Sequence, residues 1–419
     1  MLKNPNKVTL VCKKVKDASF QLANSSNKER NNALKLISKE LLKSIDKVIL
    51  ANKSDYKIAK KNKIPSHLLE RLLLNKERII NMAKDIINIS KLEDPIGKEL
   101  IKKIRPNGLN ITKVSVPLGV IAVIFESRPN VACDVACLCI KSGNAVVLKG
   151  GKEAKNTTET IIKIIRETLK KTSIDTNSVS SLQDYSRKAV NHLLKMNQYI
   201  DVLVPRGGKE LIKTVRAKSL IPIFSHLDGI CHTYIDAFAD KKMAIDITFN
   251  AKMRRTSICG ATETILCHKK IMHKVLPQLI ENLLKSGCEV RGDSDVMLLN
   301  KKVKKANERD WKKEYLDSIV SIKIVKNVLE AINHINSYSS KHTDAIITSN
   351  NRNAKLFLSK IESAIVMHNT STQFADGAEF GLGAEIGIST GKLHARGPVS
   401  TQELTTYKYL VKGNGQLRQ

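Results

Sequence analysis

Between residues 120 and 375, short apolar segments alternate with amphipathic segments of helical period, and this alternation constrains the fold more than any other feature. It predicts two mainly parallel sheets, each covered by helices on both faces, that face each other across a cleft. The expected strands are 120–125, 145–148, 202–204 and 221–224 in the first sheet, and 262–267, 319–325, 345–347 and 364–366 in the second. The expected helices are 153–171, 186–196, 208–218, 271–286, 327–337 and 353–361.

The two ends of the chain follow other patterns. Residues 7–95 are expected to be helical, with the clearest helical periods at 33–42 and 67–89, until Asp94-Pro95 interrupts the pattern. A hairpin is expected near 104–117, because Arg105-Pro-Asn-Gly108 is a turn signal followed by alternating apolar residues. The tail from residue 376 is rich in glycine and then alternates.

Composition excludes several classes of protein. No segment has the length and apolarity of a membrane span, and no signal peptide is visible, so the cytoplasm is the expected location. The formal charge of +31 would suit nucleic acid, but there is no basic block and aromatic residues make up only 4%. The abundance of Lys, Asn and Ile is typical of AT-rich coding, so nucleic-acid binding is not expected.

The eight cysteines indicate reduced thiols rather than a disulfide framework or a metal centre. Cys133, Cys137 and Cys139 lie in an apolar segment with no nearby histidine, and burial in a helix is the favoured interpretation. Cys259 differs, because cationic residues precede it and Gly260 follows it. Nearby cations would favour its thiolate. On local grounds alone, however, a structural cysteine remains the better interpretation.

Two turns have the form of phosphate-binding sites. Val204-Pro-Arg-Gly-Gly208 and Val147-Leu-Lys-Gly-Gly151 each follow a strand and precede a helix. Glycines there let backbone N–H groups approach an anion, and a helix N-terminus adds partial positive charge. The alternative is that both are tight turns without a ligand. Gly381-Leu-Gly383 lacks the strand-to-helix context of a dinucleotide fingerprint.

Taken in order, these segments resemble the gamma-glutamyl phosphate reductases, a branch of the aldehyde dehydrogenase superfamily. The resemblance runs from about residue 105 nearly to the C-terminus. It is carried by the segments Val116 to Val131, Lys141 to Gly151, Val204 to Gly208, Asp228 to Asp236, Asn250 to Cys259, Phe380 to Thr390, Lys392 to Pro398 and Glu403 to Lys408.

The resemblance implies roles for individual residues. Cys259 matches the nucleophile, and Asn130 matches an asparagine that helps to hold the oxyanion beside the Cys259 N–H. Lys149, Gly207, Gly208 and Glu314 match cofactor-binding positions. Arg128, His394 and Arg396 are weaker candidates for holding the substrate's carboxylate or phosphate. Alternatively, Arg128 only braces its loop, and His394 and Arg396 serve only oligomer contacts.

The resemblance also implies an activity and an architecture. The implied activity is NADPH-dependent reduction of L-glutamyl 5-phosphate to L-glutamate 5-semialdehyde in proline biosynthesis, with a separate glutamate 5-kinase supplying the substrate. The implied fold is aldehyde dehydrogenase-like α/β: a cofactor-binding domain (1–228), a catalytic domain (229–375), and a return segment and tail (376–419). The hairpin near 104–117 and residues 399–412 would form a small β flap for homo-oligomerisation.

Two other functions compete with this one. The first is an aldehyde dehydrogenase of the same superfamily that uses water as acceptor. Such enzymes carry a Glu-Leu-Gly-Gly motif whose glutamate activates the water, and this chain has His226-Leu-Asp-Gly-Ile there. The second is a non-catalytic basic binding protein that kept only the fold.

Overall fold

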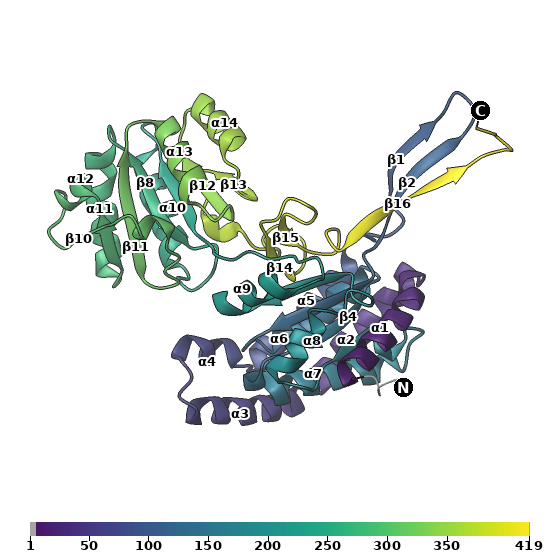
Figure 1. Cartoon of the computed structure of the whole chain (residues 1–419). Helices are drawn as coiled ribbons and strands as arrows, with labels where there is room; N and C mark the ends of the chain where they lie inside the picture. Colours follow the sequence, from purple (N-terminus) through teal and green to yellow (C-terminus); the bar gives the residue numbers. More distant parts are fainter. Residues whose placement is uncertain (1–5, 419) are drawn as a thin grey trace.

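The computed structural model describes residues 6–418, and for residues 66 and 67 only the backbone. It consists of two α/β domains, each built on one parallel sheet, and a long antiparallel flap that projects away from them (Figure 1). No helix among the described residues is long and apolar enough to cross a membrane.

The first domain is built on a four-stranded parallel sheet in the order β5-β4-β3-β6. The chain runs β3, β4, β5 toward one edge and then returns to place β6 on the other side of β3. The strands are β3 (Val120–Phe125), β4 (Ala145–Lys149), β5 (Val179–Ser181) and β6 (Val202–Arg206). The helices are α1 (Lys7–Ala23), α2 (Asn27–Lys43), α3 (Ile45–Lys61), α4 (Ser66–Leu72), α5 (Lys76–Lys91), α6 (Asn130–Lys141), α7 (Lys155–Leu169), α8 (Arg187–Leu193) and α9 (Lys209–Lys218).

Two predictions for the first domain were wrong. Residues 221–224 form no strand: their only bridge joins Ile223 to Leu203, because Pro222 has no N–H to extend a ladder. The helical pattern of 67–89 is broken between α4 and α5. The side chain of Asn52 fixes this break by donating to the Leu72 carbonyl (2.8 Å) and accepting from the Leu74 N–H (2.8 Å). By contrast, Cys133, Cys137 and Cys139 are buried in α6, as expected.

The second domain is built on a seven-stranded parallel sheet in the order β10-β9-β11-β8-β7-β12-β13. Apolar helix faces cover both sides of it. The four expected strands are present, and the sequence analysis missed β7, β9 and β10. The strands are β7 (Cys231–Ile235), β8 (Thr262–His268), β9 (Glu289–Gly292), β10 (Lys304–Lys305), β11 (Ile319–Val325), β12 (Thr343–Ile347) and β13 (Ile365–His368). The helices are α10 (Lys241–Met253), α11 (Met272–Lys285), α12 (Ser294–Met297), α13 (Val328–Tyr338) and α14 (Asn351–Lys360).

The flap is a three-stranded antiparallel sheet in the order β1-β2-β16. Its strands are β1 (Glu99–Ile104), β2 (Asn110–Pro117) and β16 (Thr405–Lys412), so the expected hairpin begins earlier than residue 104. Between β13 and the flap, β14 (Gly387–Ser389) and β15 (Gly397–Val399) pair with each other. Ile386, Val399 and Leu404 bury their side chains in the first domain's core, so the chain returns to that domain before it enters the flap.

Candidate active site

Three chemically reactive side chains meet at one edge of the second sheet. Cys259 lies just before β8, His226 lies before β7, and His342 immediately precedes β12. Strands β8, β7 and β12 are neighbours and parallel, so their amino ends share an edge of the sheet. The Cys259 sulfur and one ring nitrogen from each histidine all lie within 4.8 Å of one another.

His226 is oriented by the backbone of the return segment. Its Nδ1 lies 2.7 Å from the Ile388 carbonyl oxygen. Because a carbonyl can only accept, Nδ1 carries the proton, and Nε2 is the ring nitrogen left for the Cys259 sulfur. A nucleophile, a base and a third group that orients the base are the arrangement of an activated nucleophile.

His342 supports the sulfur from a deeper position. Its side chain is fully buried, its Nδ1 lies 2.9 Å from the Thr343 hydroxyl, and its ring meets the His226 ring edge-on at 5.0 Å. Its Nε2 has no hydrogen-bond partner among the described residues. The same donor types occur in zinc sites, but an ion there would occupy the sulfur lone pair needed for attack. The geometry therefore favours a nucleophile with two imidazole partners.

The Cys259 thiol is half-buried, not sealed in the core. Burial alone would raise its pKa, but His342 and His226 outweigh burial and hold the pKa well below its ordinary value. Burial raises the pKa of the neighbouring Cys231, whose thiol donates to the Cys259 carbonyl (3.1 Å). Cys259 is therefore the thiol of this pair that is suited to react.

Arginines of the first domain face the turn that carries Cys259. The guanidinium of Arg71, on α4, donates to the Ser257 carbonyl at 3.0 Å. Burial first, and then Arg206 and Arg71, lower the pKa of Arg128 to about 10, and Cys259 is among the charges that act on it. Arg128 follows Ser127, whose φ of 38° is a strained conformation for a serine. These arginines give the site a positive wall suited to an anionic substrate.

The first domain presents an anion-binding turn at the carboxyl ends of β3 and β6, where the strand order reverses. The Gly208 N–H, at the N-terminus of α9, donates to the carboxylate of Glu126 at 2.8 Å. A Cβ on Gly207 would lie 2.4 Å from the same carboxylate oxygen. The turn already holds an anionic group close to its backbone, so it fits a phosphate of a dinucleotide.

Two other expected cofactor residues lie in different surroundings. Lys149, at the end of β4, is buried, donates to the Gly150 carbonyl (3.0 Å) and has a pKa lowered by burial. Glu314 accepts from the Gly229 N–H at 2.8 Å. A Cβ on Gly229 would lie 2.3 Å from the Cys259 carbonyl oxygen, so Glu314 is joined to the Cys259 turn through Gly229.

Asn130, His394 and Arg396 make no described contact with Cys259. Asn130 opens α6 and donates to Asp134 at 2.9 Å, which leaves its second amide N–H free for another acceptor. His394 is exposed, with Nε2 at 3.1 Å from the Glu403 carbonyl. Arg396 pairs with Glu362, so it ties the return segment to the second domain.

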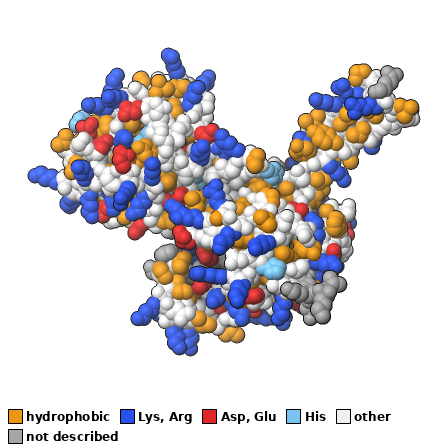
Figure 2. Space-filling view, in the orientation of Figure 1, with side chains coloured by type: hydrophobic (Ala, Val, Ile, Leu, Met, Phe, Trp, Pro, Cys, Tyr) orange, Lys and Arg blue, Asp and Glu red, His pale blue; other side chains and the backbone are white. Residues whose placement is uncertain are grey.

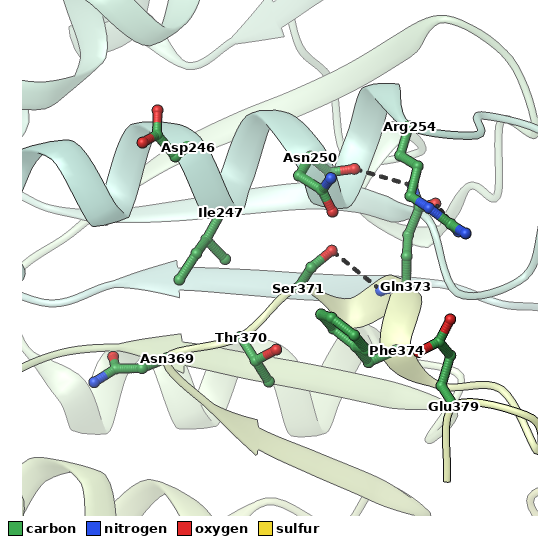
Figure 3. Close-up of a pocket in the computed structure, with 10 residues that line it drawn as sticks. All are labelled: Asp246, Ile247, Asn250, Arg254, Asn369, Thr370, Ser371, Gln373, Phe374 and Glu379. Atoms are coloured by element: carbon green, nitrogen blue, oxygen red, sulfur yellow. Dashed lines mark hydrogen bonds between the residues drawn. The ribbon is translucent and has the colours of Figure 1, made fainter. Parts of the chain in front are cut away.

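A separate pocket of about 380 Å³ lies between α10 and the turn after β13 (Figure 3). Asn250 and Arg254 line it on one side, and Ser371 and Phe374 on the other. The Gln373 side chain crosses between the two walls and donates to the Ala251 carbonyl at 2.9 Å. Neither Cys259 nor its two histidines line this pocket, so we assign it no role in the chemistry.

Sequence reasoning missed both histidines as partners of Cys259. His226 was noticed only because it replaces a glutamate motif, and His342 was not singled out. Each precedes a strand of the second sheet, as Cys259 does, and this shared position was a usable signal. It becomes informative only when β8, β7 and β12 are known to be neighbours.

Comparisons with known proteins show the family of this chain. The model of the aldehyde dehydrogenase family matches residues 3–305. Gamma-glutamyl phosphate reductase from Clostridium botulinum (strain Alaska E43 / Type E3) is 46% identical over 413 residues, which are 99% of this chain and 100% of that protein. The Rhodospirillum rubrum protein of the same name is 48% identical over 389 residues, covering 93% of this chain and 91% of the relative. The crystal structure of gamma-glutamyl phosphate reductase from Thermotoga maritima superimposes with a TM-score of 0.96 at 42% identity, over 99% of this chain and 100% of that one.

The fold and the family match show that this chain is an oxidoreductase of the aldehyde dehydrogenase family, a class that works with a nicotinamide cofactor. Within that class, the chain belongs to the gamma-glutamyl phosphate reductases, which it resembles over nearly its full length.

Proposed function

We propose that this chain reduces L-glutamyl 5-phosphate to L-glutamate 5-semialdehyde and phosphate, using NADPH, with Cys259 as the covalent nucleophile. The observation that carries the proposal is the position of the Cys259 sulfur. It is half-exposed, it lies within 4.8 Å of two imidazoles, and it faces arginines of the other domain.

The residues of the site divide the chemistry between them. The Cys259 thiolate attacks the acyl carbon, phosphate leaves, and a thioester remains on the sulfur. The second amide N–H of Asn130 and the backbone N–H of Cys259 are the proposed donors to the oxyanion. When bound, the cofactor supplies the hydride that converts the thioester to the aldehyde level. No Glu-Leu-Gly-Gly motif provides a base for water, so the thioester is kept for reduction.

The cofactor would lie across the carboxyl ends of the first sheet. Gly207 and Gly208 would hold its pyrophosphate once the Glu126 carboxylate moves aside, and Lys149 would contact its ribose and phosphate. Glu314, already joined to the Cys259 turn through Gly229, would bind the nicotinamide ribose. The preference for NADP over NAD rests on the resemblance alone.

The flap supports a homo-oligomer. Its edge strands β1 and β16 are exposed along almost their whole length and carry apolar side chains, which appear as orange patches on the projecting arm (Figure 2). These side chains are Leu100, Ile101, Ile104, Tyr407, Tyr409, Leu410 and Val411. A lone three-stranded sheet with unpaired edges is a surface that another chain can cover.

The remaining parts of the proposal concern organisation. We divide the chain into a cofactor-binding domain (1–228), a catalytic domain (229–375), and a return segment and tail (376–419). His394 and Arg396 stay weaker candidates for holding the substrate, and among the described residues they contact the Glu403 carbonyl and Glu362. A separate glutamate 5-kinase would supply the labile acyl phosphate.

Phosphate dependence tests this function directly. In the reverse direction, pyrroline-5-carboxylate, the cyclised semialdehyde, with NADP should yield NADPH only when inorganic phosphate is present. Equal rates without phosphate would show an aldehyde dehydrogenase that uses water. Cys259→Ala should abolish turnover while the fold is kept; a Cys259→Ala protein with normal turnover would contradict the role of this sulfur.

A further inference from the structure

The proton balance of the proposed reaction demands an acid at this site. Transfer of hydride to an acyl phosphate dianion gives an aldehyde and a phosphate trianion. One proton must therefore reach the phosphate oxygen as its bond to carbon breaks. Since oxyanion formation and collapse at the carbonyl carbon consume no net proton, the departing phosphate is the single step that needs an acid.

Few groups around Cys259 can supply that proton. Arginines hold their protons too tightly. Two carboxyl groups also act on Cys259, but Glu314 accepts from the Gly229 N–H, and Glu385 accepts from the Gly377 N–H at 3.1 Å. His342 is fully buried, and its Nδ1 contacts Thr343 and Cys231. His226 is half-buried, and it lines a small cavity together with Arg206 and Gly387.

The cavity beside His226 is too small to hold a phosphate, and its lining is mostly apolar apart from Arg206 and His226. The Arg206 guanidinium packs so closely on Gly387 that a Cβ there would lie 2.8 Å from its Nη1. The neighbouring Ile388 carbonyl fixes the His226 ring through Nδ1, so the ring orientation does not depend on the sulfur. The Arg206 guanidinium and the His226 imidazole N–H are nevertheless donors that suit the oxygens of a phosphate leaving the acyl group on Cys259.

We propose that His226 is a catalytic residue, the general acid that protonates the departing phosphate. This inference rests on the proposed function. His226 takes the proton of the Cys259 thiol at Nε2 and forms an imidazolium–thiolate pair. As the S–C bond forms, the C–O bond breaks, its electron pair stays on the phosphate oxygen, and the Nε2 proton moves to that oxygen. The histidine is then neutral, and collapse of the thiohemiacetal returns Cys259 as a thiolate, so the proton that restores the imidazolium before the next turnover comes from solvent.

Several charged groups set the protonation of His226. Burial alone would lower its pKa, but the Cys259 sulfur and the Ile388 carbonyl together hold the pKa above its ordinary value, against the opposing effect of Arg206. His342 and Glu314 also face the cluster. A raised pKa keeps the imidazolium populated at neutral pH, so the acid step should lose rate only as the pH rises through that pKa.

Two acyl donors with different leaving groups test the proposal. Acetyl phosphate and p-nitrophenyl acetate give the same thioester on Cys259, but p-nitrophenolate leaves readily without a proton. His226→Gln lowers the thiolate population for both donors equally. Loss of the acid should add a further fall of about 10²–10⁴-fold for acetyl phosphate alone. The ratio of the two single-turnover acylation rates therefore isolates the acid role, and alkylation by iodoacetamide measures the thiolate separately.

The controls keep the outcomes distinct. His273→Gln, at an exposed position on α11, should leave both acylation rates unchanged, and His226→Asn serves if the glutamine variant does not fold. If the ratio of the acylation rates with acetyl phosphate and p-nitrophenyl acetate is the same in His226→Gln as in the wild type, the general-acid role is overturned. If wild-type Cys259 is acylated by both donors but never by L-glutamyl 5-phosphate, the proposed function fails. The ratio of the two acylation rates would then still show whether His226 acts as the acid.

Discussion

A buried ion pair clamps the base of the turn that carries Cys259. Lys252 lies in the last turn of α10, and Glu263 is the second residue of β8. Their side chains are both fully buried and meet at 2.6 Å. The other Glu263 oxygen accepts from the Leu316 N–H at 3.1 Å. Replacing Lys252 with methionine should therefore leave a carboxyl group without its counter-ion inside the second domain. Removing one partner of a buried ion pair lowers the free energy of unfolding by about 3–5 kcal/mol. This is a large part of the total free energy of unfolding of a protein, which is about 5–15 kcal/mol.

The pH dependence of this loss has a defined sign. Burial raises the pKa of Glu263 to about 7 even beside Lys252, and without the lysine it would rise further. A carboxyl whose pKa is raised on folding contributes its stability below its unfolded pKa and loses it as pH rises through the folded value. Lys252→Met should therefore lower the free energy of unfolding by more at pH 8 than at pH 5.

The chain offers its own reporter for this measurement. Trp311, the single tryptophan, is buried in the second domain, so its fluorescence during urea unfolding follows the domain that contains the ion pair. The double variant Lys252→Met/Glu263→Gln should recover most of the lost stability, because the charge is gone and the acceptor for Leu316 is kept. At pH 8, a loss of unfolding free energy below about 1 kcal/mol for Lys252→Met, or a double variant no more stable than the single one, would refute the reasoning.

Two further changes test the site and the flap. Gly229→Ala should lower the rate of Cys259 alkylation by iodoacetamide by at least about tenfold, because the added Cβ would lie 2.3 Å from the Cys259 carbonyl oxygen. An unchanged alkylation rate would mean that the turn accommodates the added Cβ without a change in the reactivity of Cys259. Replacing the exposed Tyr407 and Val411 with lysine should convert an oligomer to monomers, which light scattering would show as a lower molar mass. The urea unfolding of the second domain, followed by Trp311 fluorescence, should not change. An unchanged molar mass would place the interface elsewhere.

Local sequence patterns predicted most of the two sheets but not their exceptions. Runs of apolar residues located β3, β4, β8 and β11 to within a residue or so, because buried parallel strands are apolar on both faces. Residues 221–224 had the same pattern, yet Pro222 prevents pairing. β7 was missed because its Cys-His-Thr-Tyr-Ile sequence mixes polar and apolar residues. Its polar His232 is tolerated inside the sheet because Nδ1 lies 2.9 Å from the buried Asp344 carboxylate.

The site was predictable only in part, for a physical reason. Resemblance to a family pointed to Cys259 and the glycine turn because each lies in a continuous motif. The partnership of His226 and His342 with the sulfur depends on strand order, which no local pattern contains. Motif membership also placed Arg396 among the candidates, although its structural partner is Glu362.

The dependence on strand order also explains how a reactive thiol is kept inactive before folding is complete. Cys259, His226 and His342 come from three separate parts of the chain, and only the adjacent pairing of β8, β7 and β12 brings them within 4.8 Å. In an unfolded chain the sulfur has no imidazole beside it, so it has the ordinary reactivity of an isolated thiol. The return segment adds a further condition, because the Ile388 carbonyl that orients His226 lies on β14, which follows the last strand of the second sheet. The activated thiolate therefore needs the return segment as well as the second sheet, because the sheet alone would leave His226 without the contact that sets its tautomer.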